Sequence, residues 1–257
     1  MVRANPHSAT GRALRGECEL HREGVRAPTG TIRVRGAREN NLNGLDADFP
    51  LGNLTVVTGV SGAGKSTLVR KVLIGHLRGD SDRGECDSVE GAKLVSDVVV
   101  VDQTPASRTP RSNIATVSKA FDGIRKRFAA TREAKARSLG PGAFSFNVRG
   151  GRCEGCEGAG EVVIDMQFLD DVRVACDDCA GRRYRREILA VHWQGKSVAD
   201  VLEMTLHEAI ALFVRDKQIV KRLEPFARVG LGYLTLGQPL STLSGGENQR
   251  VRLALAL

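Results

Sequence analysis

The chain has 257 residues, enough to bury a substantial core as one large domain or two smaller ones. With 41% hydrophobic and 26% charged residues it reads as globular, and it has no apolar run of roughly 18 residues that would span a membrane. Its formal net charge of +8 favours a polyanionic partner such as nucleic acid, although a basic balance is also common on ordinary protein surfaces.

Residues 1–30 are rich in arginine, contain three glutamates and lack the apolar core of a signal peptide. We expect a flexible basic tail and a cytoplasmic protein. Six cysteines without an export signal argue against a disulfide framework and favour metal binding.

The next segments predict strands of a sheet. Residues 31–35 alternate polar and apolar side chains, residues 45–49 offer a second strand, and the apolar run at residues 54–58 a third. The third strand would deliver the chain into a glycine-rich loop.

That loop fills the pattern G-x-x-x-x-G-K-[ST] at residues 59–66 without a mismatch, and an apolar helix pattern follows over residues 66–76. Backbone N–H groups and the helix N-terminus would surround phosphates, Lys65 would reach the terminal ones and Ser66 would bind Mg²⁺. A plain glycine-rich turn before a helix is the alternative. The residues expected to bind ATP are Gly59, Ser61, Gly62, Gly64, Lys65, Ser66 and Thr67.

A continuous β-branched run at residues 98–101 predicts a strand buried on both faces of a mostly parallel sheet. Gln103 follows at its carboxyl end, where open α/β sheets bind ligands. It is a candidate to contact the nucleotide or its Mg²⁺, or else it is only a polar residue leaving a strand.

A helix is predicted over residues 112–128. Basic residues dominate from Lys119, within this helix, to Arg152. Four phenylalanines are interleaved with these charges. Such a segment could hold a phosphate backbone, or it could be a solvated helix and loop whose phenylalanines pack inward.

Two C-x-x-C pairs, Cys153 with Cys156 and Cys176 with Cys179, are separated by nineteen residues. Each turn offers two thiolates to one tetrahedral ion, and a hairpin over residues 162–175 would bring the turns together. This spacing predicts a structural Zn²⁺ site. A redox pair or an iron–sulfur cluster is the alternative.

Four arginines surround one tyrosine at residues 182–186, directly after the second pair. They suit phosphates and a stacked base, or form one face of a solvated strand. A strand is predicted over residues 187–193, followed by helices over residues 198–202, 206–214 and 216–229.

The last motif reads LSGGENQR at residues 243–250 and runs into an apolar helix. A Ser-Gly-Gly helix start can bind phosphate, although alone it would be only a glycine-rich N-cap. Because the glycine-rich phosphate loop (P-loop) at residues 59–66 precedes it in the same chain, this motif is a candidate second phosphate-binding site.

Taken together, these residues resemble the ABC-type ATPases, whose signature is LSGGE, and more narrowly the UvrA family of bacterial nucleotide excision repair. The resemblance covers residues 31–257 and matches the second nucleotide-binding half of that family. The stretches that carry it are ENNL (39–42), TGVSGAGKSTL (58–68), VDQTPASRTPRSN (101–113), FSFNVRGGRCEGC (144–156) and VGLGYLTLGQPLSTLSGGENQRV (229–251).

The resemblance implies an α/β fold, an ABC-type P-loop ATPase sheet with an inserted helical signature region and a four-cysteine zinc module. We expect a tail at 1–30, an ATP-binding subdomain at 31–115, and a signature subdomain at 116–257 with the zinc module at about 145–190. Gln103 would sense Mg²⁺, and Ser244, Gly245, Gly246 and Glu247 would contact a nucleotide across an interface. Candidate DNA contacts are Arg108, Arg111, Arg182, Arg183 and Arg185.

The implied function is an ATP-binding, zinc-containing subunit that recognises DNA damage in excision repair and the SOS response. Its partners would be damaged double-stranded DNA, a UvrB-like protein, and a dimer mate or complementing ABC half. Alternatives are a truncated zinc and DNA-binding fragment, or a UvrA-like paralogue that confers resistance to DNA-binding drugs.

The family hydrolyses ATP with an apolar strand ending in Asp-Glu beyond the signature. The 257 residues contain no such strand after residue 250. We therefore name no catalytic residue and expect this polypeptide to bind ATP without hydrolysing it.

Overall fold

The computed structural model describes residues 2–17, 24, 26–102, 109, 111–164, 166 and 172–257. The chain divides into two compact units, Met1–Val99 and Val100–Leu257. Within the expected tail lie a short helix η1 (Val2–Ala4) and helix α1 (Ala9–Leu14), whose N-cap Ser8 accepts a hydrogen bond from the Gly11 amide. Part of this segment therefore has regular structure.

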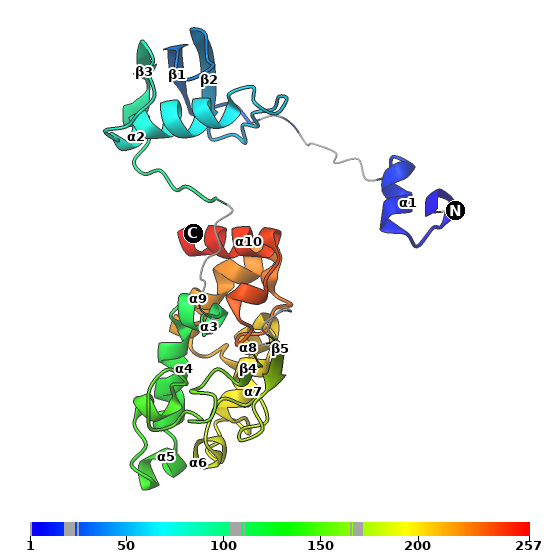
Figure 1. The fold of residues 1–257 in the computed structure, drawn as a ribbon, viewed down its shortest axis with the longest axis vertical. Helices are drawn as coiled ribbons and strands as arrows, with labels where there is room; N and C mark the ends of the chain where they lie inside the picture. Colours follow the sequence, from blue (N-terminus) through cyan, green and yellow to red (C-terminus); the bar gives the residue numbers. More distant parts are fainter. Residues whose placement is uncertain are drawn as a thin grey trace. The chain divides into compact units, whose positions relative to one another are not determined.

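A three-stranded antiparallel sheet forms the first unit, in the order β2-β1-β3 (Figure 1). Its strands are β1 (Gly30–Ala37), β2 (Leu45–Leu51) and β3 (Ser88–Glu90). Ile32 pairs with Phe49, and Val34 pairs with Ala47 on one side and Val89 on the other. Both expected strands at the start of this unit are confirmed.

The helix after the glycine-rich loop packs against this sheet. It runs as a π-helical segment η2 (Thr67–Ile74) and continues as α2 (Gly75–Arg78), with Leu68, Val72 and Leu73 in one cluster with Ile32 and Val34. Gly79 ends it in a left-handed conformation, φ 72°. A short helix η3 (Ala92–Leu94) completes the unit.

Two expected strands are absent from the described part of the chain. Residues 54–58 and 98–101 have no strand neighbour there, and the exposed fractions are 83% for Leu54 and 56% for Val99. A strand forms only where another strand pairs its backbone groups, and apolar character alone does not supply that partner. The expectation of a buried, mostly parallel sheet strand at 98–101 is wrong for this structure.

The second unit is mainly helical. Its early elements are α3 (Ile114–Val117), α4 (Ala120–Ala129), α5 (Arg132–Ala136) and η4 (Pro141–Phe144). The hairpin strands are β4 (Glu161–Ile164) and β5 (Val172–Ala175), which pair antiparallel as expected. The later elements are α6 (Arg186–Leu189), α7 (Val198–Glu203), α8 (Leu206–Leu212), α9 (Lys217–Phe226), η5 (Ala227–Leu231), η6 (Leu240–Thr242) and α10 (Gly245–Ala256).

Two details differ from the sequence expectation. The helix predicted over residues 112–128 is divided, because Lys119 adopts a left-handed conformation, φ 59°, between α3 and α4. The prediction of a strand over residues 187–193 is wrong: α6 covers its first half and buries Ile188, and Trp193 forms an isolated bridge with Lys196 across a tight turn.

Aromatic packing at the centre of the second unit settles how its phenylalanines are used. Phe121, Phe128, Phe144 and Phe146 are all buried, with tilted ring pairs at 5.2 Å between Phe121 and Phe146 and 5.5 Å between Phe128 and Phe144. Tyr184 joins them and donates its hydroxyl to the Phe144 carbonyl at 2.9 Å. Burying each ring stabilises the fold by about 1.5–3 kcal/mol. These rings pack inward and do not face a ligand.

Candidate functional site

The glycine-rich loop of the first unit forms a small pocket. Gly62 and Gly64 have φ values of 80° and 88°, which glycine adopts without strain. A Cβ on Gly64 would lie 2.7 Å from the Leu42 side chain, so only glycine permits this approach. The pocket has a volume of about 200 Å³ and is lined by Asn41, Gly62, Gly64, Lys65, Ser66 and Thr67.

Lys65 lies inside this loop. Its ammonium donates to the carbonyl oxygens of Gly59 at 2.9 Å and Val60 at 2.7 Å. These bonds hold the positive charge beside the loop amides and the start of η2. A bound phosphate would find a cation, backbone N–H groups and a helix N-terminus in one place.

Two asparagines beside the loop were not among the expected site residues. The Asn41 amide donates to the Gly62 carbonyl at 2.8 Å, and the Asn40 amide donates to the Thr67 hydroxyl at 3.3 Å. Both belong to the ENNL stretch that supported the family resemblance. That stretch was the available signal, but it did not reveal that these side chains brace the loop.

The second candidate phosphate site is the start of α10 in the second unit. Ser244 caps the helix: its hydroxyl accepts from the Glu247 amide at 3.3 Å, and the Glu247 carboxylate accepts from the Ser244 amide at 2.8 Å. Gly245 and Gly246 are exposed, and a Cβ at either would meet no atom within 4 Å. The motif therefore presents an open, accessible helix N-terminus.

A side-chain network orients Glu247. The Tyr233 hydroxyl donates to its carboxylate at 2.6 Å, and Arg250 donates to the Gly230 carbonyl at 2.9 Å nearby. The Tyr233 hydrogen bond, followed by that of the Ser244 amide, lowers the pKa of Glu247, and the same contact raises the pKa of Tyr233. This carboxylate is held in its charged form.

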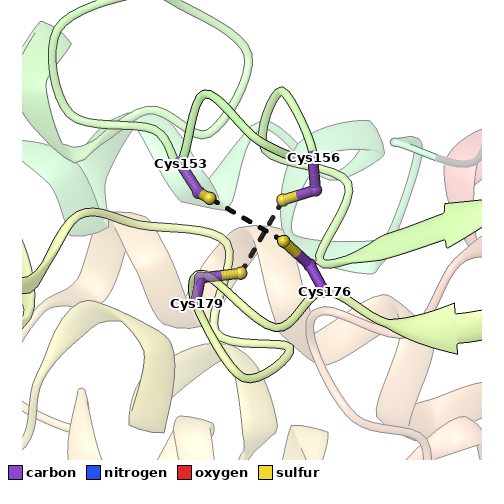
Figure 2. Close-up of side chains that lie close together, drawn as sticks. All are labelled: Cys153, Cys156, Cys176 and Cys179. Carbon is purple, nitrogen blue, oxygen red and sulfur yellow. Dashed lines mark hydrogen bonds between the residues drawn. The ribbon is translucent and has the colours of Figure 1, made fainter.

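The four cysteines of the second unit converge from two turns (Figure 2). Their sulfur atoms all lie within 4.8 Å of one another and are buried, with 4.0 Å between Cys153 and Cys176 and 3.7 Å between Cys156 and Cys179. A tetrahedral ion with Zn–S bonds of about 2.3 Å places its sulfurs about 3.8 Å apart. The donor set and its spacing fit one such ion.

Backbone amides support these sulfurs. The Gly160 amide donates to Cys156 at 3.2 Å and the Arg183 amide donates to Cys179 at 3.4 Å. Burial raises the pKa of the Cys179 thiol to about 12, so the bare thiol stays protonated at neutral pH. A bound cation would reverse that balance and favour thiolates.

Three of the predicted DNA contacts are partly engaged with carboxylates. Arg111 pairs with Glu157 at 3.1 Å, Arg182 with Asp200 at 2.6 Å, and Arg185 with Glu154 at 3.3 Å. The role of these arginines toward DNA stays a prediction.

The Arg183 side chain contacts interior groups of the second unit instead of a carboxylate. It donates to the Gly237 carbonyl at 2.8 Å and lies over the Phe146 ring at 5.3 Å from its centroid. Burial lowers its pKa. The other expected residues, Gln103 and Arg108, lie outside the described residues.

None of the helices in the described ranges is long and apolar enough to cross a membrane.

Comparison with known proteins places these features in context. Residues 42–257 match the family model described as ABC transporter. The chain is 52% identical to UvrABC system protein A of Streptomyces avermitilis over 262 residues, covering 99% of this chain and 26% of the relative. For the protein of the same name from Clostridium perfringens the values are 48% over 263 residues, 100% and 28%.

The fold of the chain is also similar to a solved structure. The crystal structure of UvrA2 from Deinococcus radiodurans superposes with a TM-score of 0.89 at 45% identity, covering 100% of this chain and 31% of that one. The chain thus spans about a quarter of the length of the curated relatives it matches.

The capped start of α10 should depend on pH. Because the pKa of Glu247 is lower in the folded chain than in the unfolded one, its contribution to stability is complete above about pH 4.3 and is lost as pH falls through the lowered pKa. We expect Glu247→Gln to lower the urea midpoint of unfolding near neutral pH. In acid, the midpoint of this variant should approach that of the unsubstituted chain. Ser244→Ala should cost about 1 kcal/mol.

Glu224→Gln is the control, because Glu224 is exposed on α9. An equal effect of Glu224→Gln, or a difference for Glu247→Gln that does not shrink in acid, would contradict this assignment.

Proposed function

The chain belongs to the ABC family and is a homologue of UvrABC system protein A, and on this basis we propose that it is an ATP-binding, zinc-containing part of a subunit that recognises DNA damage in nucleotide excision repair. The observation that carries the proposal is the phosphate-sized pocket around Lys65, in a chain about half identical to those relatives. The exposed start of α10, here called the signature helix, and the cysteine cluster support the proposal.

The proposed division of labour follows the chemistry of each site. Gly59, Ser61, Gly62, Gly64, Thr67 and the loop amides would bind ATP, and the Ser66 hydroxyl would bind Mg²⁺. Lys65 exchanges its two carbonyl partners for phosphate oxygens. Gln103 would sense the metal and the terminal phosphate. The activity proposed for this pocket is nucleotide binding.

The signature helix is proposed to act on a second nucleotide. Ser244, Gly245, Gly246 and Glu247 would contact the phosphates held by a dimer mate or a complementing ABC half, because an exposed helix start stabilises anions. Glu247 bonded to Tyr233 keeps that start rigid. A UvrB-like protein is the proposed next partner.

The cysteine cluster is proposed to hold one structural Zn²⁺. When bound, the ion would cross-link the two turns that flank the β4–β5 hairpin. Arg111, Arg182 and Arg185 surround this region and are proposed, with Arg108, to contact DNA phosphates; Arg183 would act mainly by supporting the turn.

Lys65→Ala should weaken binding of a fluorescent ATP analogue with Mg²⁺ by roughly 10- to 150-fold, because a hydrogen bond to a charged group is worth about 1.5–3 kcal/mol. Fluorescence anisotropy measures the affinity. Lys71→Ala is the matched control, since Lys71 lies on η2, directly after the loop, and pairs with Asp82 at the surface. Unchanged affinity in Lys65→Ala would disprove the pocket.

The purified chain should contain about one Zn²⁺, measured by atomic emission after dialysis. Cys176→Ser removes a ligand and should abolish stoichiometric binding. Cys86→Ser should retain the metal, because Cys86 lies in the first unit, outside the cluster. A folded, zinc-free chain with four reduced cysteines would refute the site.

Binding to distorted DNA tests the repair function. With ATP and Mg²⁺ present, a duplex carrying an unpaired bubble should bind at least about fivefold more tightly than the matched duplex, since a deformable site costs about 1 kcal/mol or more less to bend. Gel-shift titration at fixed salt measures both affinities. Equal affinity for the two duplexes would count against damage recognition by this chain.

A further inference from the structure

A basic groove separates two helices of the second unit. It lies between α4 and α9 and has a volume of about 560 Å³, within the size range of ligand sites. Both helices begin at this groove, since their N-cap residues Lys119 and Asp216 line it. A Cβ on Gly123 would lie 2.8 Å from Ile219, so the helices approach closely at its base. We refer to this feature as the α4–α9 groove.

The charge of the groove is strongly positive. Its two acidic residues are already paired: Asp122 with Arg125, and Asp216 with Arg127 at 2.6 Å. The Asp216 carboxylate also caps α9. The basic residues that line the groove are Lys119, Lys126, Arg127, Arg215, Lys217 and Arg222.

Most of these cations have no protein anion to neutralise them. Lys119, Lys126, Arg215 and Lys217 are exposed and form no ion pair with any residue that the structure describes. Cations that converge on a concave surface beside two helix N-termini attract anionic groups. The groove is therefore suited to a chain of phosphates.

An aromatic pocket of about 180 Å³ adjoins the groove and shares Arg127, Arg215 and Asp216 with it. Trp193 lines this pocket and stacks on the buried Phe213, with ring centroids 4.8 Å apart and planes 8° apart. A tight turn positions the ring, because the Trp193 amide donates to the Lys196 carbonyl at 2.9 Å. Trp193 is partly exposed, packs against Phe213 and lines the same pocket as Arg127 and Arg215.

We infer that the α4–α9 groove and the Trp193 pocket together bind single-stranded nucleic acid, with phosphates on the lysines and arginines and one unpaired base stacked on Trp193. Cationic grooves combined with aromatic platforms are the usual means of holding single strands. A base paired and stacked in a duplex has no free face to offer. The site goes beyond the proposed function, whose nucleotide and DNA contacts lie elsewhere in the chain.

Trp193 makes the inference directly measurable, because it is the only tryptophan in the 257 residues. An octathymidylate should quench its fluorescence on binding, without ATP. An abasic oligonucleotide of equal length keeps the phosphates and lacks the bases. It should bind roughly 5- to 150-fold more weakly, the loss expected for one stacked base, and leave the fluorescence nearly unchanged.

Charge variants test the groove. Lys126→Gln and Lys217→Gln should each reduce the slope of log affinity against log salt by about 0.7, the value for one single-strand phosphate contact. Lys221→Gln is the matched control, because Lys221 is exposed on α9 but does not line the groove. Its slope should not change.

The inference would be overturned by binding of octathymidylate without quenching, by equal affinity for the abasic oligonucleotide, or by an equal slope change in Lys221→Gln. Poly-glutamate that binds as tightly as octathymidylate would show a general acidic-chain surface and would also overturn it. The assay needs neither ATP nor a distorted duplex, so its result is independent of whether the proposed repair function holds.

Discussion

Four buried sulfur atoms within 4.8 Å of one another impose the constraint on which the second unit depends. Their turns lead on one side into the β4–β5 hairpin and on the other into Arg183 and Tyr184, which pack among the phenylalanine rings. The cysteine cluster and the aromatic core are thus anchored by the same backbone. Loosening the cluster would release the hairpin and disturb the core together.

The first unit is organised around its glycine-rich loop and the segment that leads into it. Its loop gathers backbone amides and the Lys65 ammonium before any phosphate arrives, with asparagines bracing the loop from outside. The segment that enters the loop, residues 54–58, has exposed apolar side chains and no strand neighbour in the described chain. Backbone polar groups need partners, and in the described chain no strand supplies them to this segment.

Positive charge has two separate uses in the second unit. Near the cysteines, arginines pair with carboxylates or enter the interior, as Arg182 and Arg183 show. Along the α4–α9 groove, lysines remain exposed and the acidic residues are already paired. A net charge of +8 does not distinguish the two arrangements, which differ in whether the basic side chains are paired with carboxylates.

Motifs whose chemistry is local could be predicted from the sequence alone. The P-loop pattern, the two C-x-x-C turns and the Ser-Gly-Gly helix start each depend on residues a few positions apart, so their spacing predicted the turns and the helix start that the structure contains, although not the Ser244–Glu247 cap. Strands 31–35 and 45–49 were predictable because one buried face imposes alternation.

Tertiary structure decided what depends on distant partners. Apolar runs at 54–58 and 98–101 did not become strands, because strand pairing comes from neighbours elsewhere in the fold. Packing also directed the phenylalanines and Arg183 inward, and it formed the groove between α4 and α9 beside the pocket that Trp193 lines. Residues some ninety positions apart meet there, as Arg127 and Asp216 do, and no local pattern encodes that meeting.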